Sequence, residues 1–292
     1  MEASGRWRRV AILGPGLLGG SLAMALKNRD LCREIVVWGR RSEAVAEAIE
    51  LGVCDGGSDD VEDVIGGADV VVLATPVPAM GEVFERGAPS LKRGALVTDV
   101  GSVKSRVVCD LEERVDQAGG VFVGSHPMAG SENAGIGYSR SDLFEGAACI
   151  LTPGNAVAGE AVAEMRSFWE SVGCRVSVET AERHDAMVAR ISHLPHAVAS
   201  AVVNVALGED GGIVDVAGAG FRDTTRVAGG DPDLWTGILT ENRDAVIPVL
   251  RELCHEIDQL ACALGDGDDE AVSQFLDRAK KLRQGCPPRD QK

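Results

Sequence analysis

The chain has 292 residues, 45% hydrophobic and 25% charged, so it can form two ordinary globular domains and is too apolar for a disordered chain. Its formal net charge of −16 opposes binding to nucleic acid or to an anionic membrane, and no apolar run approaches the roughly 20 residues that span a bilayer. The eight scattered cysteines lack zinc-ligand spacing and no leader segment is visible, which predicts a cytoplasmic protein with no metal site.

The first half of the chain alternates short apolar strands with amphipathic helices. Continuous apolar strands separated by helices indicate a parallel sheet covered on both faces. The predicted strands are Arg9–Leu13, Ile35–Trp38, Val70–Ala74, Ala95–Asp99, Val121–Gly124 and Ala148–Thr152. The predicted helices are Leu17–Asn28, Ser42–Leu51, Val77–Gly87, Lys104–Ala118 and Ala156–Val172. We therefore predict an α/β domain with a doubly wound parallel sheet over residues 1–179.

From about residue 180 the pattern changes to long helical periodicity without a convincing strand, which predicts an all-α domain over residues 180–292. Within Asp185–Val205 an apolar stripe and a small polar stripe separate onto two faces. The apolar stripe contains Met187, Ile191, Leu194, Val198 and Val202, and the polar stripe contains Asp185, Ala189, Ser192, His193, His196 and Ser200. We expect the polar face to meet solvent or a cleft. Pro195 is expected to bend this helix or to mark a segment boundary.

A glycine-rich loop of the form G-x-G-x-x-G follows the first strand and precedes the first helix. Gly14 would make the tight turn, Gly16 would let the backbone approach a pyrophosphate, and Gly19 would let helix and strand pack closely. The spacing and context predict a Rossmann domain that binds a dinucleotide. The predicted contacts are Gly14, Gly16, Leu17, Leu18 and Gly19, together with Thr75 and Pro76, which follow a strand ending at the same edge.

The residues after the second strand bear on the choice between NAD and NADP. An acidic residue there would bind the ribose 2′-hydroxyl, whereas arginine would accommodate a 2′-phosphate. Arg40, Arg41 and Ser42 stand at this place and no acid does. We predict that they contact the cofactor and favour NADP. NAD remains the alternative, with both arginines as solvated surface charges.

Candidate catalytic residues follow two later strands. His126 comes at the end of the Val121–Gly124 strand, and Ser102 follows the strand before it, so both fall at the carboxyl edge of the sheet, where α/β proteins bind ligands. Both could reach an alcohol whose carbon gives up hydride to a nicotinamide. The alternatives are a histidine satisfied by backbone groups and a serine that caps the following helix.

Several motifs together resemble the prephenate/arogenate dehydrogenases of tyrosine biosynthesis. They are Gly14–Ser21, Asp99–Lys104, Gly124–Glu132, His184-Asp185, Ser192–His196 and Gly220–Arg226, in the order of that family. The resemblance implies an oxidoreductase that oxidises the ring C4 alcohol of prephenate or arogenate, passes hydride to NAD(P)⁺ and releases the ring carboxylate as CO₂. It also implies that His126 accepts the hydroxyl proton and that Ser102 orients substrate or imidazole.

The resemblance further implies a set of substrate-binding residues. Arg226 would bind a substrate carboxylate through its guanidinium fork, next to Asp223 in an Asp-x-x-Arg pattern. Its alternative is a simple ion pair along a helix. His193, His196 and Trp235 would line the substrate pocket, and Glu132 with Asp185 would belong to an ionic network that holds the arginine.

Two rival functions and two open choices remain at this level. A β-hydroxyacid dehydrogenase would need a lysine in the helical domain, and none occurs between Lys104 and Lys280. A catalytically silent NADP-binding sensor is the second rival. Asp231 or Asp233 could read the ammonium group of arogenate, although Asp231-Pro232 also fits a helix start. The amphipathic segment Asp244–Leu264 predicts a homodimer, with an intramolecular helix as its alternative.

Overall fold

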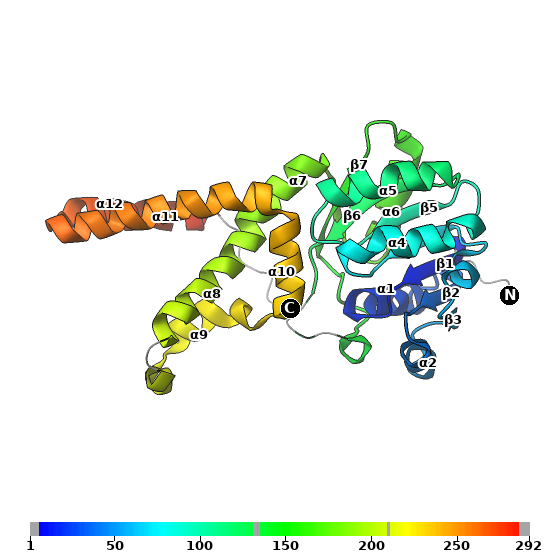
Figure 1. Cartoon of the computed structure of the whole chain (residues 1–292), viewed down its shortest axis with the longest axis horizontal. Helices are drawn as coiled ribbons and strands as arrows, with labels where there is room; N and C mark the ends of the chain where they lie inside the picture. The colour runs from blue at the N-terminus through cyan, green and yellow to red at the C-terminus, as the bar shows by residue number, and fades with distance from the viewer. Residues whose placement is uncertain (1–5, 131–132, 134, 209–210, 286–292) are drawn as a thin grey trace. The chain divides into compact units, whose positions relative to one another are not determined.

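A computed structural model describes residues 6–130, 133, 135–208 and 211–285 (Figure 1). The chain divides into two compact units, Met1–Arg243 and Asp244–Lys292. The first unit holds the whole sheet and also the helices of residues 181–241, and the second holds the last two helices. The domain boundary predicted after residue 179 stays a prediction, since compactness places these helices with the sheet.

The first unit contains an eight-stranded sheet in the order β3-β2-β1-β4-β5-β6-β7-β8. All neighbouring strands run parallel except β6 and β7, which pair antiparallel. The strands are β1 (Trp7–Leu13), β2 (Cys32–Trp38), β3 (Gly56–Ser58), β4 (Val70–Leu73), β5 (Leu96–Asp99), β6 (Val121–Pro127), β7 (Ala148–Pro153) and β8 (Arg175–Val178). The order reverses between β1 and β4, the point where such sheets bind ligands.

Helices connect the parallel strands and continue into the second half. In the sheet region they are α1 (Leu17–Asn28), α2 (Ser42–Glu50), α3 (Val61–Ile65), α4 (Val77–Gly87), α5 (Ser105–Gln117) and α6 (Gly159–Ser171), with the short helices η1 (Ala88–Ser90) and η2 (Ile136–Tyr138). The later ones are α7 (Ala181–Val188), η3 (Ala189–His193), α8 (Leu194–Leu207), η4 (Gly211–Val216), α9 (Ala219–Thr225), η5 (Arg226–Gly229), α10 (Pro232–Glu241), α11 (Arg243–Asp266) and α12 (Asp269–Gln284).

Two hydrophobic cores cover the two faces of the sheet. Val10 and Ile12 of β1 face one core with α1 and α6, whereas Ala11 and Leu13 face the other with α3, α4 and α5. Successive side chains of a strand point to opposite faces, so a strand covered on both sides must be apolar at every position. This explains the continuous apolar runs and confirms the predicted α/β class.

The sheet differs from the prediction in three strands. β3 and β8 were not predicted, because β3 is only three residues long with two glycines and β8 is largely exposed at the sheet edge. The predicted parallel arrangement holds for the other strand pairs and fails between β6 and β7, where His126 pairs with Ile150 in antiparallel register. In the described part of residues 128–147 only the short helix η2 occurs, and an antiparallel return does not need a crossover helix.

The helices α7, η3 and α8 form one continuous stretch. The η3 turn is π-helical, and Pro195 stands in the first turn of α8, which confirms the predicted segment boundary. The stretch Ala181–Leu207 has the length and composition of a membrane-crossing helix, with 28% of its most apolar window buried. It also carries four buried polar residues, His184, Asp185, His193 and His196. Those four side chains belong to the cluster described next.

Candidate active site

The glycine loop joins β1 to α1 and closes against the end of β4. Gly14 has φ +120°, and a Cβ there would lie 2.6 Å from the carbonyl oxygen of Ala74. A Cβ on Gly19 would lie 2.0 Å from the carbonyl oxygen of Gly14, so helix and strand pack too closely for a side chain. A Cβ on Gly16 would meet nothing within 4 Å. The loop is therefore tightly packed on both sides of an open position at the start of α1.

Polar groups surround this loop at the ends of the neighbouring strands. Arg40, Arg41 and Ser42 follow β2 and are all exposed. Thr75 and Pro76 follow β4, and the buried hydroxyl oxygen of Thr75 has no hydrogen-bond partner among the described residues. A ligand spanning these strand ends would meet an open backbone cradle, two guanidinium groups and one unpaired hydroxyl. Within the described residues no cluster of His, Cys, Asp or Glu could hold a metal ion.

A fully buried ion pair supports the end of β6. Lys104 pairs with Asp99, and both side chains are 0% exposed. The Lys104 ammonium also donates to the carbonyl oxygen of Ser125 at 3.0 Å, and the Ser125 amide donates to Asp99 at 3.0 Å. Burial lowers the pKa of the Lys104 amine, an effect that the Asp99 carboxylate opposes. The pair thereby holds both backbone groups of the residue that precedes His126.

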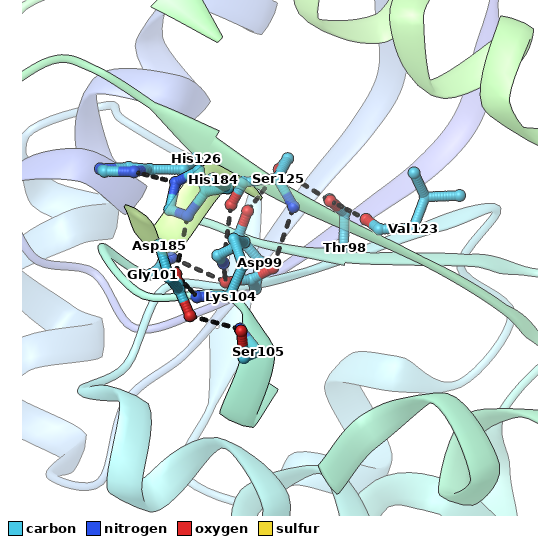
Figure 2. Close-up of polar contacts among 10 residues, drawn as sticks. All are labelled: Thr98, Asp99, Gly101, Lys104, Ser105, Val123, Ser125, His126, His184 and Asp185. Carbon is cyan, nitrogen blue, oxygen red and sulfur yellow. Dashed lines mark hydrogen bonds and ion pairs between the residues drawn. The ribbon is translucent and has the colours of Figure 1, made fainter. Parts of the chain in front are cut away.

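His126 begins a buried chain of hydrogen bonds, shown in Figure 2. Its Nδ1 lies 2.8 Å from Nε2 of His184, and Nδ1 of His184 lies 2.8 Å from Oδ1 of Asp185. Burial lowers the pKa of His126 well below its ordinary value of 6.5, and the electrostatic influence of its neighbours, first His184, acts in the same direction. His126 is consequently neutral at neutral pH and can accept a proton.

The carboxylate of Asp185 also holds the start of α5. Its two oxygens accept hydrogen bonds from the backbone amides of Lys104 and Ser105, at 2.7 and 2.8 Å. Burial raises the pKa of Asp185, but these hydrogen bonds and that of His184 outweigh it, so the net pKa is lowered. Asp185 is therefore an ionised group fixed at a helix N-terminus. The predicted ionic network of Asp185 with Glu132 and the arginine stays a prediction, since Glu132 lies outside the described residues.

A second pair of histidines comes from η3 and α8. Nδ1 of His193 lies 3.1 Å from the side-chain amide of Asn242, which also donates to the carbonyl oxygen of Asp185 at 3.0 Å. His196 stacks on Trp235, with ring centroids 3.5 Å apart and planes 10° apart. Burial lowers the pKa of His193 to about 4. Nε2 of His193 and Nδ1 of His196 are buried and lack a partner in the described part of the chain, so both are available to a ligand.

The other predicted site residues lie in varied settings. Arg226 begins η5 and Asp223 lies on α9, and both are exposed. Ser102 is half-buried in the loop after β5, and its predicted role as a helix cap is wrong. The helix starts later, at Ser105, because Asp185 from α7 binds its first amides. Glu132 falls outside the described residues.

Sequence reasoning assigned no role to several residues that shape the site. His184 and the Asp99–Lys104 pair lie inside the motifs that carried the resemblance, so their positions were visible but their partners were not. Asn242 lies outside every motif and becomes visible only through its contacts. Gly230 was also missed: a Cβ there would lie 2.6 Å from Nε1 of Trp235, so only glycine admits the indole beside His196.

Comparison with known proteins gives a consistent result along the chain. Residues 22–178 match the family model described as the nucleotide-binding domain of prephenate dehydrogenase, and residues 180–278 match its dimerization domain. The chain is 35% identical over 285 residues to a cyclohexadienyl dehydrogenase of Zymomonas mobilis, covering 95% of both chains. It is 34% identical to a prephenate dehydrogenase of Bacillus subtilis, covering 96% of this chain and 76% of the relative.

Solved structures, among them the following two, also resemble nearly the full length of the chain. One is a prephenate dehydrogenase from A. aeolicus in complex with hydroxyphenyl propionate and NAD⁺, at 33% identity and a TM-score of 0.88, covering 96% of this chain and 99% of that one. The other is an arogenate dehydrogenase of Synechocystis, at 31% identity and a TM-score of 0.80, covering 94% and 99%. The similarity therefore extends over the sheet and over the helices of the second half.

Proposed function

Because the chain belongs to the prephenate dehydrogenase family, we propose that it oxidises and decarboxylates prephenate, arogenate or both, with hydride transfer to NAD(P)⁺. The observation that carries the proposal is the environment of His126. This histidine lies at the end of β6, it is neutral through burial, and its Nδ1 is already hydrogen-bonded to His184. Only its Nε2 is left to act on a substrate.

The residues around the glycine loop fit a dinucleotide. Gly16 leaves open space at the N-terminus of α1, where a pyrophosphate would meet backbone amides and the positive end of the helix dipole. The unpaired hydroxyl of Thr75 and the guanidinium groups after β2 lie at the same edge of the sheet. When bound, the nicotinamide would accept the hydride.

The residues of the chain supply binding and proton transfer. In the proposed reaction Nε2 of His126 takes the proton of the C4 hydroxyl as hydride leaves the same carbon, and loss of CO₂ then gives an aromatic ring. Ser102 is proposed to orient the hydroxyl or the imidazole. His193, His196 and Trp235 are proposed to line the pocket, supported by the two unpaired imidazole nitrogens. Arg226 is proposed to bind a substrate carboxylate, with Asp223 and Glu132 holding the arginine in place.

A preference for NADP is part of the proposal. It is supported by Arg40 and Arg41, both exposed at the end of β2, and by the absence of an acid among residues 39–42. Arg40→Asp is expected to raise KM for NADP⁺ at least about tenfold while the value for NAD⁺ rises less or falls. Arg33→Asp, an exposed control on β2, should leave the ratio unchanged. An unaltered ratio in Arg40→Asp would contradict the preference.

We further propose that the protein is a cytoplasmic homodimer. Residues 180–278 match a dimerization domain, and large apolar side chains are exposed there, including Val205 at 85% and Val216 at 86%. A second copy would cover this surface and account for the apolar composition of α8. Light scattering should give twice the chain mass, and Val205→Glu should lower it, while Ile49→Glu on the exposed side of α2 should not.

The direct test compares prephenate and arogenate, each with NAD⁺ and NADP⁺, by the absorbance of the reduced nicotinamide. Turnover with at least one pair is expected, and His126→Asn should lower kcat by about 10²–10⁴-fold. His255→Asn, at an exposed position on α11, is the matched control and should retain activity. Binding of NADP(H) without turnover of either substrate would overturn the proposal in favour of a silent sensor.

The choice between prephenate and arogenate has its own test at Asp231. Its carboxylate caps α10 by accepting hydrogen bonds from the amides of Asp233 and Leu234. The alternative that Asp231-Pro232 starts a helix is therefore confirmed. Asn caps a helix as well as Asp does, which makes Asp231→Asn a change of charge at constant structure. If the carboxylate also reads the arogenate ammonium, the kcat/KM ratio shifts toward prephenate. An unchanged ratio would leave Asp231 with its capping role only.

A further inference from the structure

We propose that His184 and Asp185 act as positioning residues that hold His126 in the one tautomer able to accept the substrate proton. The inference rests on the proposed role of His126 as base. His184 has no such role in the function proposed above, and Asp185 was expected to bind an arginine. The geometry points instead to a linear chain from the carboxylate to the catalytic ring, drawn in Figure 2.

The tautomers follow from counting donors and acceptors along this chain. An ionised carboxylate can only accept, so the 2.8 Å contact between Asp185 Oδ1 and His184 Nδ1 requires a proton on that nitrogen. In neutral His184 the other nitrogen, Nε2, then carries a lone pair and accepts. The 2.8 Å contact with His126 therefore requires a proton on Nδ1 of His126. Nε2 of His126 is left with its lone pair, as a base needs.

The carboxylate of Asp185, where the series of hydrogen bonds begins, is held in its ionised form. Asp185 is 6% exposed, and both its oxygens accept backbone amides at the N-terminus of α5. Both amides donate hydrogen bonds to the carboxylate. If Asp185 were protonated, its acid proton would compete with these amide protons for the carboxyl oxygens. The helix start thus sets the direction of every hydrogen bond up to His126.

Because these residues are buried, the donor and acceptor roles in their hydrogen bonds decide which tautomer His126 adopts. His184 is 0% exposed and His126 7%, so water cannot readily replace a lost partner. The free imidazole of histidine favours the tautomer with its proton on Nε2, the opposite of the one required here. Removing the acceptor at His184 would let His126 relax toward that inactive form.

The hydrogen-bonded series Asp185–His184–His126, here called the relay, stabilises the positive charge that forms on His126. The relay itself gains and loses no atoms over the reaction. In the proposed step the substrate O–H bond breaks and a proton joins Nε2 of His126, while the C–H electron pair leaves as hydride to the nicotinamide. The imidazolium keeps its Nδ1–H bond to His184, whose polarity is fixed by Asp185. The proton later leaves from Nε2, so the relay returns to its starting state.

Other charged groups face His126 and must be counted in any pH measurement. His184 of α7, Lys104 at the start of α5 and His193 of η3 all lower the pKa of His126. Asp99 on β5 neutralises Lys104 at close range. These groups remain in place when only His184 is changed.

The experiment reads the tautomer directly. With ¹⁵N-labelled histidine the chain gives only five imidazole pairs, and a protonated ring nitrogen is well separated from a bare one in chemical shift. Wild-type protein is expected to show His126 with a protonated Nδ1 and a bare Nε2. The signal of His126 is assigned from its loss in His126→Asn. An unprotonated Nδ1 of His126 in the wild type would overturn the proposal, whether or not the protein shows dehydrogenase activity.

Two variants separate positioning from mere support of the fold. His184→Phe keeps a buried ring but has no acceptor, so His126 should shift toward the Nε2-protonated form and kcat should fall about 100-fold with KM little changed. His184→Gln can accept from His126 through Oε1 and donate to Asp185, so it should restore the wild-type tautomer and most of kcat. Loss of activity in both variants with an unchanged His126 tautomer would contradict the relay. Absence of turnover in wild type with the expected tautomer would refute the proposed function alone.

Discussion

The glycine loop after β1 and the histidine cluster beside β6 reach their geometry in different ways. The turn of the loop is built within a dozen consecutive residues, and its backbone contacts the strand ends at Trp38 and Ala74 and the side chain of Ser139. The cluster joins His126, His184 and Asn242 from three separate elements. The shape of the loop is set by glycines that are close in sequence, whereas the cluster forms only when residues far apart in sequence pack together.

The two regions also treat polar groups differently. The loop offers backbone and open space, and its glycines exist because side chains would collide. The cluster instead buries four histidines, two carboxylates and a lysine, and several of these groups bind one another. A buried charge without its partner is strongly unfavourable, so the cluster should fail more sharply than the loop when one member is removed. The following predictions test that contrast.

The largest effect is expected at the buried ion pair. Asp99→Leu leaves the Lys104 ammonium without a carboxylate in a fully buried position, and should lower the free energy of unfolding by about 3–5 kcal/mol. Glu85→Gln, which breaks the exposed ion pair with Arg114, should change it by less than about 1 kcal/mol. Denaturant titration measures both. A loss in Asp99→Leu as small as that of the control would show that the pair is not structural.

The glycine loop should separate stability from cofactor binding. Gly19→Ala places a Cβ 2.0 Å from a carbonyl oxygen and should destabilise the fold by about 1–3 kcal/mol, with loss of cofactor binding. Gly16→Ala has open space and should keep the wild-type stability while weakening NADP(H) binding about tenfold. Thermal unfolding and fluorescence titration give the two readouts. Equal stability losses in both variants would refute this division.

The pH dependence of stability should reveal the buried imidazoles. His193 is neutral when folded, with a pKa of about 4, whereas in the unfolded chain it protonates below about 6.5. The unfolded state therefore binds more protons between these values, and stability present above pH 6.5 is lost as the pH falls toward 4. The expected loss from this group is about 2 kcal/mol between about pH 7 and pH 5. His126 shifts in the same direction and adds to it.

Paired substitutions isolate that contribution. His193→Asn should make the decline between about pH 7 and pH 5 less steep, while His255→Asn, at an exposed histidine, should leave it as steep as in wild type. Urea titrations at the two pH values provide the comparison. A decline of the same slope in His193→Asn would mean that His193 is not held neutral.

The smallest effect is expected at the cap of α10. Asp231→Ala removes the acceptor for the amides of Asp233 and Leu234 and should destabilise by about 1 kcal/mol, whereas Asp231→Asn should change stability by less than about 0.5 kcal/mol. Thermal unfolding of the two variants checks this. Equal losses would place the effect in the charge rather than in the cap.

The sequence predicted the parts of the molecule that local rules govern. Periodicity located the helices Leu17–Asn28 and Val77–Gly87 at their observed bounds, and glycine spacing located the loop. The short strand Gly56–Ser58 and the exposed strand Arg175–Val178 have no such pattern. The start of α5 was misplaced because its cap comes from Asp185, eighty residues away. Hydrogen-bond partners of that kind depend on packing, which periodicity does not encode.

The measurement that tests the central claim most directly is the pH dependence of kcat/KM for the better substrate, which reports groups of the free enzyme. Because burial lowers the pKa of His126, activity should be constant through neutral pH and fall on the acid side with a midpoint below 6.5. That limb should be absent from the residual activity of His126→Asn. A midpoint at or above 6.5, or a wild-type profile in His126→Asn, would contradict the assignment of His126 as the base.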